Sequence, residues 1–235
     1  MDCIRLSVVV PCFNEEARLP VTLGPARHYL EQSGGAFELV VVDDGSSDRT
    51  AEVVQEMVAG DPRVTFVRLP RNRGKGRALA EGVARSMGSL VLVSDADFST
   101  PMDELPKLEA RIGSGADVAI GSRARHGARE VDQPLHRRLM GKAFNLLVQA
   151  LLLPGIWDTQ CGFKLFRGEV ARELFARLCT EGFAYDIEVL YRARRAGYRV
   201  DEVPVRWINS STTRVHALRH SREMLMDLLR VRFAL

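Results

Sequence analysis

The chain has 235 residues, 46% of them apolar and 27% charged, which is the composition of a soluble globular protein and excludes a disordered or fibrous one. The most apolar stretch, residues 143–153, is too short for a membrane-spanning helix, which needs about 20 apolar residues. The four cysteines form no Cys-x-x-Cys pair, so neither a disulfide framework nor a zinc site is expected. The first residues lack the pattern of a secretory signal, and we therefore expect a cytoplasmic protein.

The net charge of +3 conceals two halves of opposite sign. Residues 1–120 carry 13 Lys and Arg against 18 Asp and Glu, a balance of −5, whereas residues 121–235 carry 20 against 12, a balance of +8. An acidic front half suits a bound cation, and a basic back half suits phosphates or lipid head groups. Unevenly scattered surface charge without a function is the alternative at this stage.

Strand-like and helical patterns alternate through the first 120 residues. Apolar, β-branched runs predict buried strands at residues 6–10, 37–42, 64–68, 90–94 and 117–121. Helical apolar spacing predicts helices at residues 19–32, 49–59, 76–87 and 102–112. This order predicts an α/β fold with a mostly parallel sheet and helices on both faces. Ligands of such sheets bind beyond the carboxyl ends of the strands.

The back half is less regular. The pattern predicts helices near residues 169–178, 183–195 and 216–233 and a strand at residues 198–207, while residues 157–164 break the periodicity. Because the sequence shows no repeat and no long linker, we predict one domain spanning residues 1–235.

Pairs of carboxylates follow two of the predicted strands. Asp43 and Asp44 come after the second strand, and Asp95 and Asp97 come after the fourth. Acidic residues at this edge repel one another unless they bind a ribose, a base or a metal, and two carboxylates separated by one residue can hold one divalent cation. A helix cap by Ser47 or a simple turn remains the alternative for such short patterns.

A basic loop, residues 71–77, precedes the third predicted helix with four cations and two glycines. Its backbone N–H groups and the helix N-terminus are suited to an anion. The loop lacks both the P-loop pattern and the dinucleotide-binding fingerprint, which argues against an ATPase or a dehydrogenase. A solvated basic loop with no ligand is the alternative.

The motifs together carry a family resemblance. Residues 8–16 read VVVPCFNEE, residues 42–48 read VDDGSSD and residues 95–97 read DAD, in that order along the chain. They resemble the family 2 inverting glycosyltransferases of GT-A fold. The later blocks DTQCGFKLF at residues 158–166 and FAYDIEVL at residues 183–190 resemble the branch that glycosylates polyprenyl or dolichyl phosphates.

The resemblance implies a GT-A sheet with C-terminal amphipathic helices, a nucleotide- and metal-binding half at residues 1–120 and an acceptor-binding half at residues 121–235. The expected donor is a nucleotide-sugar with Mg²⁺ or Mn²⁺. The residues expected to hold the nucleotide are Pro11, Phe13, Glu15, Asp43, Asp44, Lys75, Asp95, Ala96, Asp97 and Arg214. The expected metal contacts are Asp95, Asp97 and Ser99.

The resemblance also implies residues that act on the acceptor. Arg123 and Arg137, with Arg138 as an alternative to Arg137, would grip the acceptor phosphate. The residues expected on the sugar side are Asp158, Gln160, Lys164 and Asp186, followed by Glu188. An anionic lipid phosphate needs no general base, whereas a hydroxyl acceptor would require one of these carboxylates as base. An exposed helix face with a Glu188–Arg192 pair is the alternative for Asp186 and Glu188.

We therefore expect a metal-dependent enzyme that transfers glucose from UDP-glucose to a dolichyl or undecaprenyl phosphate. The motif at residues 72–76 favours glucose over a GDP-mannose-dependent mannosyltransferase, and a hydroxyl acceptor in glycan synthesis is the other alternative. Residues 135–153, together with the C-terminal helix, predict peripheral contact with the inner face of the membrane. A core or dimer helix has the same spacing, and a homodimer or a separate membrane partner is a further expectation. The basic residues show no nucleic-acid-reading motif.

Overall fold

The computed structural model describes residues 4–131, 135–209 and 217–234. The nine strands described there are β1 Leu6–Cys12, β2 Phe37–Asp43, β3 Val64–Arg68, β4 Leu90–Ser94, β5 Val118–Ser122, β6 Arg129–Val131, β7 Phe163–Arg167, β8 Val200–Pro204 and β9 Arg206–Ile208. The α-helices are α1 Leu19–Gln32, α2 Thr50–Val58, α3 Lys75–Arg85, α4 Leu105–Gly113, α5 Leu135–Leu151, α6 Gly168–Ala176, α7 Tyr185–Arg195 and α8 Ala217–Ala234, and a 3₁₀ turn, η1, spans Met102–Glu104.

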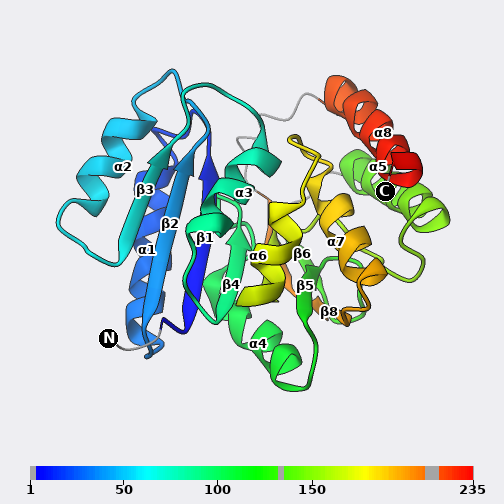
Figure 1. Ribbon diagram of the computed structural model, residues 1–235, viewed down its shortest axis with the longest axis horizontal. Helices are drawn as coiled ribbons and strands as arrows, with labels where there is room; N and C mark the ends of the chain where they lie inside the picture. Colours follow the sequence, from blue (N-terminus) through cyan, green and yellow to red (C-terminus); the bar gives the residue numbers. More distant parts are fainter. Residues whose placement is uncertain (1–3, 132–134, 210–216, 235) are drawn as a thin grey trace.

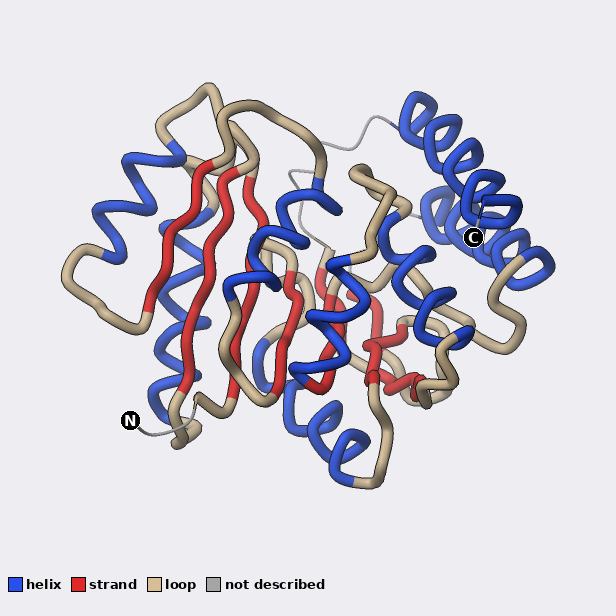
Figure 2. The backbone as a smooth tube through the Cα atoms, viewed as in Figure 1, coloured by secondary structure: helices blue, strands red, loops and turns tan. Residues whose placement is uncertain are grey.

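A seven-stranded sheet in the order β3-β2-β1-β4-β7-β5-β8 forms the centre of the molecule (Figure 2). Its neighbouring strands pair in parallel except for β7, which is antiparallel to both β4 and β5. Strands from the two halves of the chain therefore share one sheet, because β7 lies between two strands of the front half.

Helices cover both faces of this sheet (Figure 1). Alternate side chains of β1 point to opposite faces, as strand geometry requires. Val9 joins the core cluster that contains Leu79 of α3 and Leu174 of α6, whereas Val8 joins the cluster that contains Leu23 of α1 and others from α4. The inner parallel strands are buried on both faces, which requires nearly continuous apolar sequence. Such runs make the positions of these strands predictable.

The α/β fold and all nine elements expected in the front half are confirmed, with shifts of one or two residues at some ends; the helix expected at residues 102–112 begins as the 3₁₀ turn η1 before α4. The prediction for the back half was wrong at three places, one of which is the unpredicted short strand β6. Residues 163–167 form β7, which the broken periodicity hid. The strand expected at residues 198–207 is two strands, because the Val205 N–H bonds to the Ser122 carbonyl and the Val205 carbonyl accepts from Arg129, which turns the chain away from β5. There β9 pairs with β6.

The topology brings the loops after β1, β2 and β4 to one edge of the sheet. Because β7 runs in the opposite direction, the segment before it, residues 158–162, reaches the same edge. No helix among the described residues is long and apolar enough to cross a membrane.

Candidate active site

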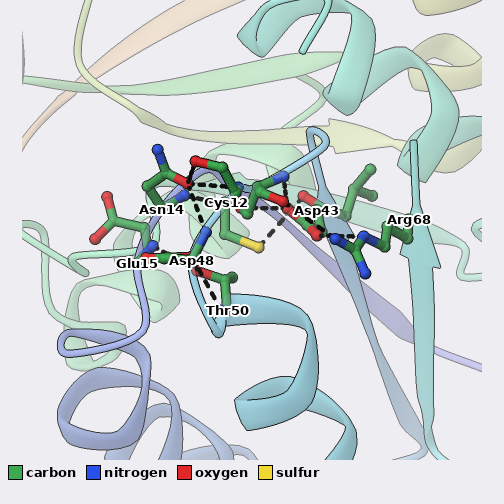
Figure 3. Close-up of polar contacts among 10 residues, drawn as sticks. Cys12, Asn14, Glu15, Asp43, Asp48, Thr50 and Arg68 are labelled. Atoms are coloured by element: carbon green, nitrogen blue, oxygen red, sulfur yellow. Dashed lines mark hydrogen bonds and ion pairs between the residues drawn. The ribbon is translucent and has the colours of Figure 1, made fainter. Parts of the chain in front are cut away.

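The loops after β1 and β2 are bonded to each other (Figure 3). Asn14 has a positive φ of 54°, and its side-chain Oδ1 accepts a hydrogen bond from the Ser47 backbone N–H at 2.9 Å. The Glu15 backbone N–H donates to Thr50 Oγ1 at 2.7 Å. These bonds fix the β1 loop over the entry to α2.

Asp43 lies at the floor of these loops and is fully buried. Its Oδ1 accepts the Ser46 backbone N–H at 2.9 Å. Its Oδ2 lies 3.3 Å from Arg68 Nε but has no hydrogen bond within the described part of the chain. A surface hollow lined by Gly45, Ser46, Arg68, Leu69 and Pro70 lies beside this carboxylate. A buried acceptor without a hydrogen-bond donor is costly, so Asp43 Oδ2 is suited to accept a hydrogen bond from a ligand in this hollow.

Asp44 holds the basic loop in place. Its two oxygens accept the backbone N–H groups of Arg73 and Gly74 at 2.8 and 2.7 Å. Burial raises the pKa of Asp44, and the two backbone donors only partly offset this. The turn requires glycine at residue 45, which has a φ of +70° and lies so close to Arg71 that a Cβ would overlap its backbone. The basic loop is thus tethered to β2 rather than freely solvated.

The loop after β4 presents Asp95 and Asp97. Phe98 adopts a left-handed φ of 44°, which is strained for a bulky residue, and the Ser99 backbone N–H donates to Asp97 Oδ1 at 2.9 Å. Burial and the neighbouring Asp95 charge raise the pKa of Asp97. Gly162 packs against this loop, since a Cβ there would lie 2.1 Å from Asp95 Oδ2.

These residues fit a hard divalent cation. Asp95 and Asp97 supply carboxylate oxygens, and the buried Ser99 Oγ has no hydrogen-bond partner among the described residues. Oxygen donors of this kind suit Mg²⁺ or Mn²⁺. No cluster of three or more His, Cys, Asp or Glu side chains forms within the described ranges, so a cation here would need further ligands from a substrate or water.

Lys75, the first residue of α3, extends into this site. Its Nζ donates to Asp95 Oδ1 and lies 5.5 Å from the centroid of the Tyr185 ring. Burial lowers the pKa of Lys75, but Asp95 and the more distant Asp186 and Asp97 outweigh it, so the pKa lies above its ordinary value.

On the back half, Arg123 and Asp158 form a bidentate pair. Arg123 Nε and Nη2 donate to the two Asp158 oxygens at 2.7 and 2.8 Å, and the guanidinium lies 5.4 Å from the Trp207 ring. Burial raises the pKa of Asp158, but the Arg123 charge, the hydrogen bonds from Arg123 and the Lys164 charge together outweigh burial, so the pKa lies below its ordinary value. Glu202 accepts the backbone N–H groups of Trp157 and Asp158. The predicted phosphate-binding arginine thus already has a carboxylate partner.

Lys164 and Asp186 are paired inside the protein. The Lys164 side chain is 1% exposed, and its Nζ donates to Asp186 Oδ1 and to the Cys161 carbonyl. We expected Lys164 to line the sugar side, but the structure places it in the interior, because β7 is a central strand. Glu188 is also buried, and it accepts from Cys179, Thr180 and Arg192. The alternative for Asp186 and Glu188 is therefore half right: the Glu188–Arg192 pair is present at 2.7 Å, but the exposed helix face is wrong, because both carboxylates are buried.

The remaining predicted residues lie at several places. Pro11 is buried within β1, Phe13 is 39% exposed, and Glu15 forms an ion pair with Arg18 at 3.1 Å. The Ala96 carbonyl accepts from Thr22, and Gln160 reaches Met224 of α8. Arg137 and Arg138 lie in α5, but the structure does not describe their side chains. Arg214 lies outside the described residues altogether.

Sequence reasoning missed Arg68 and Tyr185. Arg68 is the last residue of β3, and its register partner in the sheet is Asp43. A predicted parallel pairing of the second and third strands could have found it. Tyr185 is 1% exposed, and its hydroxyl has no hydrogen-bond partner among the described residues. It lies within the block at residues 183–190, but no sequence pattern assigned it a role of its own.

The chain belongs to glycosyl transferase family 2, whose family model matches residues 7–175. Among similar proteins, the dolichyl-phosphate beta-glucosyltransferase of Homo sapiens is 37% identical over 97% of this chain and 75% of its own length. The protein of the same name from Dictyostelium discoideum is 34% identical over 99% of this chain and 75% of its own length.

A solved structure shows the same fold. Glucosyl-3-phosphoglycerate synthase from Mycobacterium tuberculosis, in complex with Mn²⁺ and UDP-glucose, has a TM-score of 0.70 and 21% identity, covering 99% of this chain and 80% of that one. The mixed, mostly parallel seven-stranded sheet is thus of the GT-A type.

Proposed function

We propose that this protein transfers glucose from UDP-glucose to a dolichyl or related polyprenyl phosphate. The similarity to dolichyl-phosphate beta-glucosyltransferases over nearly the whole chain carries this proposal. The described site supports it, because its front half offers carboxylates for a nucleotide and a cation, and its back half offers cations.

The nucleotide occupies the edge formed by β1, β2 and β4. The Asp43 carboxylate accepts a hydrogen bond from an N–H group of the base in the hollow beside Arg68. Asp95, Asp97 and Ser99 hold a divalent cation. When bound, such a cation neutralises charge on the leaving diphosphate, and Lys75 lies close enough to share that task.

The acceptor needs positioning more than activation. A phosphate monoester is largely dianionic at neutral pH, so its oxygen attacks the sugar without a protein base. Asp186 is bonded to Lys164, which leaves it poorly placed as a base and favours a phosphate over a hydroxyl acceptor. Arg123, with Arg137 from α5, meets the acceptor phosphate, and Asp158 keeps the Arg123 guanidinium oriented until it arrives. Gln160, whose backbone N–H donates to Asp158 Oδ1 at 3.3 Å, contributes to the sugar side, and Arg214 is the basic residue that we propose for the donor diphosphate.

The lipid acceptor is reached from the membrane surface. Helices α5 and α8 lie at the same end of the molecule (Figure 1), and both contribute to one core cluster. They also expose large apolar side chains, including Leu146 at 60% and Phe233 at 81%. An apolar helix surface beside cations such as Arg230 is suited to a head-group layer. We infer peripheral attachment on the cytoplasmic face.

A transfer assay tests the reaction. The protein is incubated with Mn²⁺, dolichyl phosphate and one labelled donor at a time: UDP-glucose, UDP-galactose, UDP-N-acetylglucosamine or GDP-mannose. We expect label to enter the lipid phase from UDP-glucose alone. Transfer from GDP-mannose would make it a mannosyltransferase, and label in water-soluble product only would reject the lipid acceptor.

Vesicle flotation tests the membrane contact. The double variant Leu146→Ser/Phe233→Ser should lose most of its binding to vesicles. Val21→Ser is the matched control, because Val21 is 71% exposed on α1. Equal loss in both variants, or in neither, would reject the α5 and α8 surface.

A further inference from the structure

The two carboxylate oxygens of Asp95 have different neighbours: Gly162 packs against Oδ2, and Lys75 bonds to Oδ1. Gly162 packs so closely against Asp95 Oδ2 that a Cβ would overlap it, and Lys75 Nζ is bonded to Oδ1. The Asp95 side chain nevertheless stays 36% exposed, against 20% for Lys75. Solvent ions can thus approach Asp95, but one oxygen already has a cation.

The Lys75 ammonium has a second favourable contact, with the Tyr185 ring. The ammonium lies 5.5 Å from the centroid of the Tyr185 ring, within the range of a cation–π contact. The Lys75 stem is flexible, and α3 anchors only its backbone. The ammonium can therefore leave Asp95 without losing all of its favourable contacts.

We propose that Lys75 is a resident counter-cation, which holds Asp95 while the metal site is empty and is displaced when a divalent cation binds. The inference rests on the proposed function, since it concerns the same metal–nucleotide site. On displacement, the ammonium turns toward Tyr185 or toward the diphosphate of the donor. Metal and nucleotide then bind cooperatively, because the diphosphate stabilises the displaced lysine.

Binding of Mn²⁺ alone, followed by electron paramagnetic resonance without any donor, tests this directly. Lys75→Met keeps the apolar stem and removes the charge, so Mn²⁺ should bind about tenfold more tightly than to the wild-type protein. Lys75→Arg restores the cation and should keep the weak wild-type affinity. Lys107→Met is the matched control, because Lys107 pairs with Glu104, and it should change nothing.

The coupling to UDP gives a second readout. Saturating UDP should tighten Mn²⁺ binding to the wild-type protein by a larger factor than in Lys75→Met. Circular dichroism verifies that each variant is folded. Equal or weaker Mn²⁺ binding by Lys75→Met overturns the inference, and so does the absence of Mn²⁺ binding to both proteins. Sugar transfer by the wild-type protein is scored separately, so the inference can fail while the proposed function stands.

Discussion

Carboxylates of the two halves differ in how their charge is balanced. In the back half, Asp158, Asp186, Glu188 and Glu202 each have a basic partner, respectively Arg123, Lys164, Arg192 and Arg125. At the front edge, the four carboxylates Asp43, Asp44, Asp95 and Asp97 share two ion pairs among the described residues, Asp43 with Arg68 and Asp95 with Lys75. The balanced pairs stabilise the fold, whereas the excess negative charge at this unbalanced edge supports the proposed cation site.

The largest expected effect is on catalysis at the unbalanced edge. Asp97→Asn keeps an acceptor for the Ser99 N–H but removes a metal-binding charge, so we expect glucosyl transfer to fall by about 1,000-fold, near 4 kcal/mol. Initial rates with UDP-glucose and Mn²⁺ measure this. Asp201→Asn is the control, since Asp201 lies on β8 and forms an ion pair with Arg199 instead of lying at the site. Retention of more than a tenth of the activity in Asp97→Asn would remove Asp97 from the site.

Breaking a balanced pair should affect stability instead. Lys164→Met leaves the Asp186 carboxylate buried without its cation, which should lower the free energy of unfolding by about 3–5 kcal/mol. Urea denaturation at pH 7 measures the change. Adding Asp186→Leu to Lys164→Met should restore most of the lost free energy of unfolding. If the double variant is no more stable than the single one, the pair is not the source of the loss.

The two regions should also respond to pH with opposite signs in metal-free buffer. The pKa of Asp158 is lowered, so its stabilisation is present above the ordinary value of 3.8 and is lost as the pH falls through the folded value. Asp158→Asn should therefore be less stable by roughly 2 kcal/mol at pH 7, with the difference vanishing in acid.

Asp97 has a raised pKa, so its protonated form stabilises the fold below the ordinary value, and this contribution is lost as the pH rises through the folded value. Asp97→Asn should raise the free energy of unfolding by up to about 1 kcal/mol at pH 7, and this increase should also disappear in acid. Unfolding free energies across pH 3–8 compare the two variants. Effects of the same sign at pH 7 would remove the contrast between the regions.

The smallest effect is expected where the halves meet at the surface. Arg73 and Glu181 form an ion pair with side chains 39% and 45% exposed. Glu181→Gln should change the free energy of unfolding by less than about 1 kcal/mol, since solvent and salt screen such pairs. A thermal melt measures it, and a loss of 2 kcal/mol or more would show that this contact joins the halves.

The sequence predicted strands best where an apolar run is bounded by turn residues. The strands β3 and β4 were placed with their observed ends, because both are apolar runs between turn residues. The short β7 was missed, because Lys164 interrupts its apolar pattern, and only the buried partner Asp186 explains a lysine there. Local patterns do not report partners that are distant in sequence.

In the candidate site too, the sequence located some residues but not the partners that they contact. Asp43, Asp44, Asp95 and Asp97 could be located, because each follows a readable strand. Their partners could not, since the Asp44 bonds to residues 73 and 74 depend on loop conformation. The Arg123–Asp158 pair likewise joins residues 35 positions apart, and neither position alone predicts it.

The most direct test of the unbalanced edge is the affinity for UDP with and without Mn²⁺, measured by isothermal titration calorimetry on the wild-type protein. If these carboxylates hold the nucleotide through a cation, UDP should bind at least about tenfold more tightly with Mn²⁺ than with EDTA. Asp97→Asn should abolish that difference. Equal UDP affinity of the wild-type protein in Mn²⁺ and in EDTA would contradict a metal-linked nucleotide site at Asp95 and Asp97.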